Sequence, residues 1–296
     1  MVRFSPNKKA FLYCAVISLT VLCFLTGLII FDPAPKVNLS EQVRFLNLYG
    51  LSIFLAVLIS LLLLSLILPP ELKNDSILVS SLWVVTPAIL IARIWHVITD
   101  FSYYQNDLIQ ILSIHKGGLS SWGALLGGVI GIYLLSRFKN YNPKLLMNYI
   151  ATVVPVGVAI GRVGNYFNCE LFGPATDKPW GIFIPPNSRP AHLLDEVIFH
   201  PTFYYEAVLN IFLFWILLSL LYNNKGANNF LVAAVYLFGY GCIRFYVEFY
   251  RLSSDFIEIL SLNQVIALLL VFLGIGYIIK VNYELIRSAT LQQSRF

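Results

Sequence analysis

The chain has 296 residues, of which 58% are hydrophobic and only 12% charged, and its formal net charge at pH 7 is +5. So few charged side chains could not cover a water-soluble protein of this length, whereas a chain immersed in lipid needs few. The positive charges are spread along the chain without a basic run, which excludes a nucleic-acid-binding surface.

Eight apolar stretches are each long enough to cross a bilayer, which takes about 20 residues. In chain order they are residues 10–31, 47–68, 76–99, 117–136, 147–168, 201–222, 230–250 and 262–280. The sequence therefore predicts an all-α, polytopic helical bundle in the membrane.

The distribution of basic residues predicts the topology. If the N-terminus is cytoplasmic and the spans alternate, eleven basic residues lie inside and six outside. The inner set is Arg3, Lys8, Lys9, Lys73, Arg137, Lys139, Lys144, Lys225, Lys280, Arg287 and Arg295, and the outer set is Lys36, Arg44, Lys116, Lys178, Arg189 and Arg251. Because Lys and Arg favour cytoplasmic loops, we expect both termini inside.

The first stretch, residues 10–31, is expected to be an uncleaved membrane anchor. Its apolar core exceeds the roughly 7–15 residues of a signal peptide, the alternative, and no small-x-small cleavage site follows. The four cysteines, Cys14, Cys23, Cys169 and Cys242, show no CxxC spacing. We therefore expect neither a disulfide framework nor a metal site, and interpret the cysteines as small apolar fillers.

Two segments on the predicted outer side are longer than the other connections. In residues 100–116, the apolar residues Leu108, Ile109, Ile111 and Leu112 could form a short amphipathic helix at the membrane surface. Residues 168–200 are rich in Gly and Pro, and a loop of this length is more often functional than idle. For both segments, a plain connector is the alternative.

Polar residues within the spans gather toward the outer side. At ~1.5 Å per residue, Arg162 lies about 27 Å from Lys144 at the inner boundary, and Glu248 lies about 27 Å from Phe230. A solute transporter needs polar groups through the whole thickness of the membrane, or broken helices near its middle, so this class is disfavoured. A site at one leaflet suits a substrate that resides there, such as a phospholipid headgroup.

The segment 161–173 carries Arg162, Asn165, Asn168 and Glu170 at the end of a span, where polar groups are costly unless they face a functional cavity. Tyr240, Arg244, Glu248 and Arg251 share one helical face of a later span. One interpretation is an internal Arg244–Glu248 pair without function. The other joins Arg162 and Arg244 into a phosphate receptor, because guanidinium groups bind phosphate oxygens bidentately.

Other polar and small residues in or next to the spans also stand out. Arg93 and His96 are either packed or snorkelling residues, or part of a site. Glu206, which lies inside the sixth span, follows the interfacial tyrosines Tyr204 and Tyr205. The small residues from Gly117 to Gly123 allow either tight helix packing or room for a lipid.

Several ordered motifs carry a family resemblance. They are Tyr49-Gly50, Ala92-Arg93-Ile94, Gly117-Gly118-Leu119-Ser120, Gly161-Arg162-Val163-Gly164-Asn165 through Asn168, Glu170 and Gly173, Lys178-Pro179-Trp180-Gly181, His200-Pro201 through Tyr205-Glu206, Gly239-Tyr240-Gly241-Cys242-Ile243-Arg244 and Glu248-Phe249-Tyr250-Arg251. With these motifs, the chain from about Arg44 to Lys280 resembles the prolipoprotein diacylglyceryl transferases of bacteria.

The resemblance implies seven core transmembrane helices, with one extra helix before them, and a division into an anchor with its linker (1–43) and a transferase domain (44–296). It implies an enzyme of the bacterial plasma membrane, with its active site near the outer leaflet and no cofactor. This enzyme would move a diacylglyceryl group from phosphatidylglycerol to the lipobox cysteine of a preprolipoprotein signal peptide. The products would be a thioether and glycerol phosphate, in the first step of lipoprotein maturation.

Roles follow for individual residues from the same resemblance. The expected catalytic residues are Arg162, Arg244, Glu170 and Glu248, with the two carboxylates holding the arginines in place. The expected phosphatidylglycerol contacts are Arg162, Asn165, Tyr49, Gly173, Tyr240 and Arg93. Where many members carry a histidine proposed as a base, this chain has Trp122. His96, His200, Glu170 and Glu248 remain candidates for the base, and a lipid-binding or lipid-moving protein without chemistry remains the alternative function.

Overall fold

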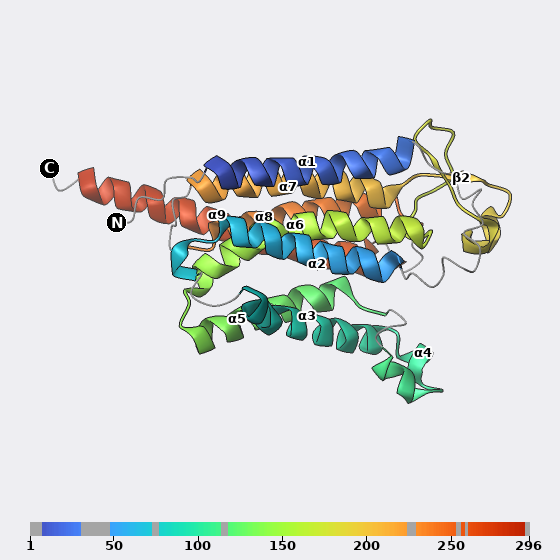
Figure 1. Cartoon of the computed structure of the whole chain (residues 1–296), viewed down its shortest axis with the longest axis horizontal. Helices are drawn as coiled ribbons and strands as arrows, with labels where there is room; N and C mark the ends of the chain where they lie inside the picture. The colour runs from blue at the N-terminus through green and yellow to red at the C-terminus, as the bar shows by residue number, and fades with distance from the viewer. Residues whose placement is uncertain are drawn as a thin grey trace. The chain divides into compact units, whose positions relative to one another are not determined.

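The computed structural model describes residues 8–30, 48–72, 77–113, 118–223, 229–252, 256–257 and 260–293. Within these residues, eight helices are long and apolar enough to cross a membrane. They are α1 (Lys8–Ile30), α2 (Leu48–Ile67), α3 (Ile77–Thr99), α5 (Ser121–Lys139), α6 (Pro143–Phe167), α7 (Thr202–Asn223), α8 (Leu231–Glu248) and α9 (Leu262–Gln293). The predicted all-α polytopic fold is confirmed (Figure 1).

The ends of the helices depart from the predicted spans where local capping decides. Helix α5 begins at Ser121 because Gly118 takes a left-handed backbone conformation (φ 76°) and the Ser120 side chain accepts a hydrogen bond from the Gly123 N–H. Helix α6 begins earlier than predicted, at Pro143, a residue suited to the first helical turn. Helix α9 continues beyond the apolar stretch to Gln293.

The short elements lie between the spans. They are α4 (Phe101–Tyr104), the 3-10 helices η1 (Pro70–Leu72), η2 (Leu108–Leu112), η4 (Pro186–Ser188) and η5 (Ala191–Leu193), and the strands β1 (Ile182–Phe183), β2 (Ile198–Phe199), β3 (Phe256–Ile257) and β4 (Leu260–Ser261). Both strand pairs are antiparallel, β1 with β2 and β3 with β4. The predicted short helix at residues 108–112 is thus a 3-10 helix.

The segment 168–200 is a compact structure with an apolar cluster of its own. Phe172, Ile182, Ile184 and Phe199 pack together with Phe203 of α7. The pairing of β1 with β2 brings Ile182 opposite Phe199. The segment is therefore tied to the start of α7 by packing as well as by the chain.

The chain divides into two compact units, residues 68–147 and residues 1–67 with 148–296. In the smaller unit, α3 packs against α5. Gly123, Gly127 and Gly131 recur every fourth residue of α5, and a Cβ atom on any of them would come within 3 Å of the α3 backbone. Of the two interpretations, tight helix packing therefore holds at Gly123, and the same close packing continues to Gly127 and Gly131. Gly117 lies outside the described residues.

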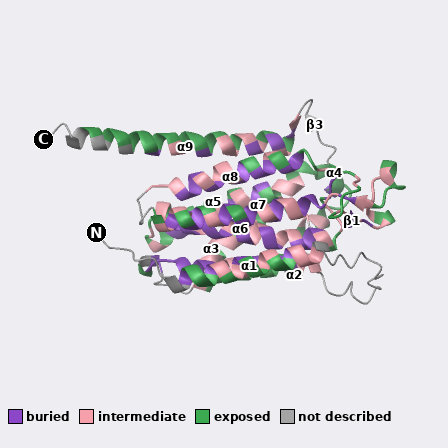
Figure 2. Cartoon of the chain, turned by 90° about the horizontal axis from the view of Figure 1, so that it is seen from above, coloured by how far each residue is buried: buried purple, intermediate pink, exposed green. Residues whose placement is uncertain are grey.

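In the larger unit, α8 packs against both α7 and α9, and α1 packs against α2 and α7. Figure 2 shows the buried residues concentrated along α6, α7 and α8. Helix α1 buries one face, which includes Ala10, Cys14, Ser18 and Leu25. Cys14 is thus a packed filler as expected, whereas Cys23 and Cys242 are exposed on the outer faces of their helices. The predicted boundary between residues 43 and 44 lies outside the described residues and stays a prediction.

One buried asparagine interrupts the apolar part of this unit away from the polar end. Asn148 of α6 donates from Nδ2 to the Asn229 carbonyl oxygen (2.8 Å) and accepts at Oδ1 from the Ala233 N–H (3.1 Å). The first N–H groups of a helix have no partner within the helix. Asn148 supplies one from a neighbouring helix and so fixes the start of α8 against α6.

Candidate active site

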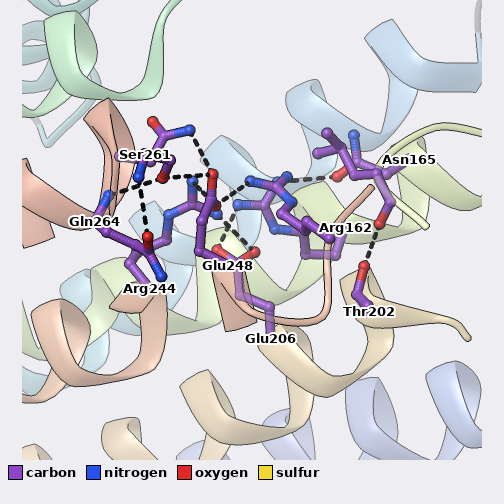
Figure 3. Close-up of polar contacts among 11 residues, drawn as sticks. Arg162, Asn165, Thr202, Glu206, Arg244, Glu248, Ser261 and Gln264 are labelled. Atoms are coloured by element: carbon purple, nitrogen blue, oxygen red, sulfur yellow. Dashed lines mark hydrogen bonds and ion pairs between the residues drawn. The ribbon is translucent and has the colours of Figure 1, made fainter. Parts of the chain in front are cut away.

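The polar cluster lies at one end of the larger unit. The last turns of α6 and α8 and the first turns of α7 and α9 meet there, and each contributes charged or amide side chains (Figure 3). These turns come from sequence segments that are as much as 100 positions apart, so the cluster is a product of helix packing.

Glu206 of α7 is the centre of the cluster. Its residue exposure is 0%, and its Oε1 accepts from Arg162 Nη2 at 2.5 Å, while Oε2 accepts from Arg244 Nη1 at 3.2 Å. A buried carboxylate without partners is strongly unfavourable, and two guanidinium groups compensate this one. The predicted convergence of Arg162 and Arg244 is therefore present, with Glu206 as the shared partner.

Glu248 forms a second centre. Its Oε2 accepts from Arg244 Nη2 (3.4 Å) and Arg251 Nη1 (3.3 Å). Its Oε1 accepts from Ser261 Oγ (3.2 Å) and Asn263 Nδ2 (2.8 Å). The Arg244–Glu248 pair allowed by the helical spacing exists, and it is one link of a larger network.

The start of α9 is held to this network by its own cap. The Ser261 N–H donates to Gln264 Oε1 at 3.0 Å, and the Gln264 N–H donates to Ser261 Oγ at 3.2 Å. These reciprocal bonds form a capping box. The same Ser261 hydroxyl reaches Glu248, so the position of α9 is coupled to the charged cluster.

Asn165 extends the network toward the segment 168–200. Its Oδ1 accepts from Arg162 Nη1 at 3.0 Å, and its Nδ2 donates to Glu170 Oε1 at 2.7 Å. Glu170 lies between two residues with left-handed backbone conformations, Cys169 (φ 51°) and Leu171 (φ 57°). Residues other than glycine rarely adopt this backbone conformation, and those that do are often found at functional sites.

Glu170 and Glu248, which were predicted to hold the arginines in place, contact them in different ways. Glu248 contacts Arg244 and Arg251 directly. In the hydrogen bonds described here, Glu170 reaches Arg162 through Asn165. Glu170 thus positions the side-chain amide of Asn165, which in turn accepts a hydrogen bond from Arg162.

Tyr49 of α2 lies against α6 beside this region. A Cβ atom on Gly164 would come within 2.7 Å of the Tyr49 ring, so the glycine is what lets the ring approach the helix. Gly164 lies between Arg162 and Asn165 near the end of α6. The predicted contact of Tyr49 with the headgroup stays a prediction, and the location of Tyr49 in this region is compatible with it.

Gly173 and Tyr240 are packed residues. The Gly173 N–H donates to the His200 carbonyl oxygen at 2.8 Å, and a Cβ atom there would collide with the Tyr250 carbonyl oxygen and Thr202. Tyr240 is buried and stacks on Tyr236, with ring centroids 5.6 Å apart. Their predicted lipid contacts stay predictions.

Arg93, His96 and Trp122 belong to the smaller unit. Arg93 donates to the carbonyl oxygens of Ile111 (2.9 Å), Gly118 (2.9 Å) and Gln110 (2.5 Å). His96 Nδ1 lies 3.0 Å from the Asp100 carboxylate, and Trp122 is buried. The predicted contact of Arg93 with phosphatidylglycerol stays a prediction, and the described contacts of its guanidinium are with these backbone carbonyl oxygens and with the ring of Tyr104.

Another possible base, His200, lies at the start of α7. Its Nδ1 is 2.8 Å from the Tyr205 hydroxyl, which also accepts from Trp180 Nε1 at 2.8 Å. This contact connects the segment 168–200 with the residue that precedes Glu206.

Glu206, Ser261, Asn263 and Gln264 were not among the predicted site residues. Glu206 had two signals, a carboxylate inside an apolar span and its place at the end of the motif that begins with His200-Pro201. Its role depends on two arginines from other helices, and no spacing along the chain encodes that meeting. Ser261 and Asn263 carry no sequence signal, because polar residues at the start of a helix are ordinary caps.

Three arginines gather around the two buried carboxylates of the cluster. Arg162, Arg244 and Arg251 form ion pairs with Glu206 and Glu248, and Glu170, which is joined to Arg162 through Asn165, balances the third positive charge when all six groups are ionised. Burial, together with the neighbouring charge of Arg244, lowers the pKa of Arg251 to about 10. A third guanidinium crowded into the cluster in this way favours the arrival of an anion.

Comparison of the sequence with known proteins identifies a family. Residues 39–280 match the family model described as prolipoprotein diacylglyceryl transferase. Helix α1 precedes the matched region, and the other seven spans lie in it or begin in it.

Three relatives carry the name phosphatidylglycerol–prolipoprotein diacylglyceryl transferase. The relative from Acaryochloris marina is 37% identical over 206 residues, which are 70% of this chain and 74% of the relative. The relative from a Synechocystis species is 36% identical over 243 residues, 79% of this chain and 84% of the relative. The relative from Thermosynechococcus vestitus is 33% identical over 252 residues, 85% of this chain and 94% of the relative.

The family model covers most of the chain, and the motifs that carry the resemblance contribute the cluster around Glu206. The chain belongs to the prolipoprotein diacylglyceryl transferase family.

Proposed function

We propose that this protein transfers the diacylglyceryl group of phosphatidylglycerol to the lipobox cysteine of preprolipoproteins in the bacterial plasma membrane, at the outer leaflet. The observation that carries the proposal is the meeting of Arg162 and Arg244 on the buried carboxylate of Glu206. The family name of the relatives supports transfer over the alternative of lipid binding without chemistry.

The two arginines suit a phospholipid phosphate. Guanidinium groups offer paired donors in the geometry of phosphate oxygens. Arg162 is the proposed principal phosphate ligand and Arg244 its partner at the leaving group. Glu206 is a positioning residue, because it fixes the separation and direction of both guanidinium groups before the lipid arrives.

The reaction is a displacement at a glycerol carbon. The cysteine sulfur forms a bond to the carbon that carries the phosphate, and the bond from that carbon to the phosphate oxygen breaks. The electron pair leaves with glycerol phosphate, and the thiol proton passes to a base. Positive groups placed where the negative charge develops stabilise the transition state, and this is the task proposed for Arg162 and Arg244.

The nucleophile must be a thiolate. A free cysteine has a pKa of about 8.5, and nearby positive charge lowers it. The guanidinium groups of Arg162 and Arg244 would therefore favour ionisation of the incoming cysteine, as well as binding of the lipid. Glu248 already accepts four hydrogen bonds, which leaves it little capacity to take the thiol proton. Glu170 and His200 are the proposed bases of the larger unit.

The predicted topology supports a site at the outer leaflet. With both termini inside, the end of α6, the start of α7, the end of α8 and the start of α9 all lie on the outer side. The segment 168–200 follows α6 on that same side, where the cysteine of a translocated precursor would arrive. A lipid substrate would then reach Arg162 without crossing the membrane.

The test uses the purified protein in vesicles with phosphatidylglycerol and a lipobox peptide. Mass spectrometry should detect a thioether-linked diacylglyceryl peptide, and equimolar release of glycerol phosphate should accompany it. A peptide with serine in place of cysteine serves as the control. Binding of the lipid without any thioether product under these conditions would contradict the proposal.

A further inference from the structure

The most exposed large apolar side chains of the described residues gather in the smaller unit, at the end of α3 and in the segment that follows it. Leu112, Ile109, Ile98 and Tyr103 are 81%, 76%, 72% and 68% exposed. Figure 2 shows α4 as a largely exposed element. Large apolar patches of this kind mark a surface that is covered in use.

The segment has a defined internal structure. Arg93 donates to the backbone carbonyl oxygens of Gln110, Ile111 and Gly118, which lie on both sides of residues 114–117. Its guanidinium carbon also lies 5.1 Å from the centre of the buried Tyr104 ring. One charged group from α3 thus holds the backbone of the segment from within.

The acidic residue before η2 completes this arrangement. Asp107 accepts from the Ile109 N–H at 3.1 Å and from Gln110 Nε2 at 3.0 Å. Asp107 and Arg93 thus both form hydrogen bonds with backbone groups of η2, inside the protein. Backbone groups that have such partners can enter a region of low water content, where unpaired ones could not.

The apolar surface continues an exposed apolar stripe of α3. Leu90, Ile94 and Ile98 recur every fourth residue, are exposed and belong to a helix that is apolar enough to cross a membrane. The exposed residues of α4 and η2 follow directly after this stripe. This continuity argues for the bilayer as the partner, because an exposed apolar stripe on a helix long enough to cross a membrane suits contact with lipid.

We propose that residues 101–112 form an interfacial anchor that lies in the membrane surface, with Leu108, Ile109 and Leu112 inserted among the lipids and with Arg93 fixing its depth. An element with one apolar side and internally satisfied polar groups binds at the boundary of headgroups and acyl chains. The proposal is independent of the transferase reaction. It assigns Arg93 a structural role as the clamp of the anchor.

The depth of the anchor can be measured with a fluorescent label. The four native cysteines are replaced by alanine, and a single cysteine is introduced as Ile109→Cys or Leu112→Cys and labelled with bimane in vesicles of phosphatidylglycerol and phosphatidylcholine. Nitroxide groups on the lipid headgroup or on a shallow acyl carbon should quench both labels several-fold more than a label at Asn106→Cys, the exposed polar control in the same segment. Quenching equal to that of the control, or protection from both the lipid nitroxide and water-soluble iodide, would overturn the anchor.

A second measurement tests the clamp. In the Ile109→Cys protein, Arg93→Ala should lower lipid quenching toward the level of the Asn106 control, because three carbonyl oxygens lose their donor. Arg93→Lys should recover only part of the quenching, since an ammonium group cannot reproduce the planar fork. Unchanged quenching in Arg93→Ala would overturn the role of Arg93. Thermal unfolding shows whether α3 and α5 remain packed in each variant.

Discussion

Arg162 and Glu206 are 44 positions apart in the sequence, yet Nη2 of the guanidinium lies 2.5 Å from Oε1 of the carboxylate. This contact joins α6 to α7, and the other oxygen of the same carboxylate joins α7 to α8 through Arg244. The three helices are therefore connected by charge at the end where the family motifs meet.

Replacing Glu206 with glutamine tests the centre of the cluster. Glu206→Gln keeps the size of the side chain and removes the charge that both arginines share. We expect transfer to fall by about 10- to 100-fold, and the free energy of unfolding to fall by about 3 kcal/mol, because a buried ion pair is broken. Glu196→Gln, at an exposed position of the segment 168–200, is the matched control. A wild-type rate at all phosphatidylglycerol concentrations in Glu206→Gln would remove its positioning role.

Substitutions of Arg162 test the phosphate contact. Arg162→Ala should lower kcat/KM by about 10²–10³, the usual effect of removing one donor that stabilises developing charge. Arg162→Lys should recover part of the loss, since it retains the charge but lacks the fork. The exposed Arg137 in the last turn of α5 provides the control Arg137→Ala. An Arg162→Ala protein that keeps the wild-type rate would show that the phosphate binds elsewhere.

The side of the membrane on which the site lies can be determined by labelling. In a variant whose four native cysteines are replaced by alanine, Lys178→Cys lies in the exposed part of the segment 168–200, and Asn223→Cys lies at the other end of α7. A membrane-impermeant maleimide added to intact cells, with any outer membrane made permeable, should label Cys at position 178 and leave position 223 unlabelled until the plasma membrane is opened. The reverse order would place the cluster at the inner leaflet and contradict the proposed function.

Two adjacent glycines of α5 provide a stability test with a built-in control. A Cβ atom on Gly127 would collide with the backbone of Pro87 and Ala88, whereas nothing lies within 4 Å of a Cβ atom on Gly128. Gly127→Val should therefore destabilise the smaller unit by about 2–3 kcal/mol, since the α3 backbone cannot yield as a side chain would. Gly128→Val should change the unfolding free energy by far less. Equal effects in urea unfolding would contradict the close packing of α3 on α5.

Asn148 is expected to contribute stability away from the cluster. Asn148→Leu leaves the Asn229 carbonyl oxygen and the Ala233 N–H without the partner described above. An unsatisfied buried group costs about 1–3 kcal/mol. Thermal unfolding should therefore shift downward, while the transfer rate of the folded protein stays near wild type. A large loss of transfer rate in the folded variant would link the start of α8 to the site.

Much of the architecture could be predicted because lipid imposes a simple rule. A backbone in hydrocarbon must satisfy its own hydrogen bonds, so apolar stretches of sufficient length become helices whatever their neighbours are. The eight spans followed from that rule. Their ends did not, because they depend on local devices such as the Ser120 cap and the left-handed Gly118.

Some site residues could be predicted because charge within an apolar span is rare and stands out. Arg162, Arg244 and Glu248 were identifiable in this way, and the helical spacing put Arg244 and Glu248 on one face. Arg93 was equally conspicuous, yet its described partners are backbone carbonyls and the ring of Tyr104. Rarity shows that a charge needs a partner, and it does not identify the partner.

The sequence by itself determined that the chain crosses the membrane as helices, and it determined the family through ordered motifs. Only the tertiary structure decided that Glu206 is the shared partner of Arg162 and Arg244, and that Ser261 and Asn263 complete Glu248. The physical reason is that hydrophobicity and helical periodicity are local properties of the chain. A buried ion cluster is defined by the distances between helices, and these are set by the packing of all their side chains together.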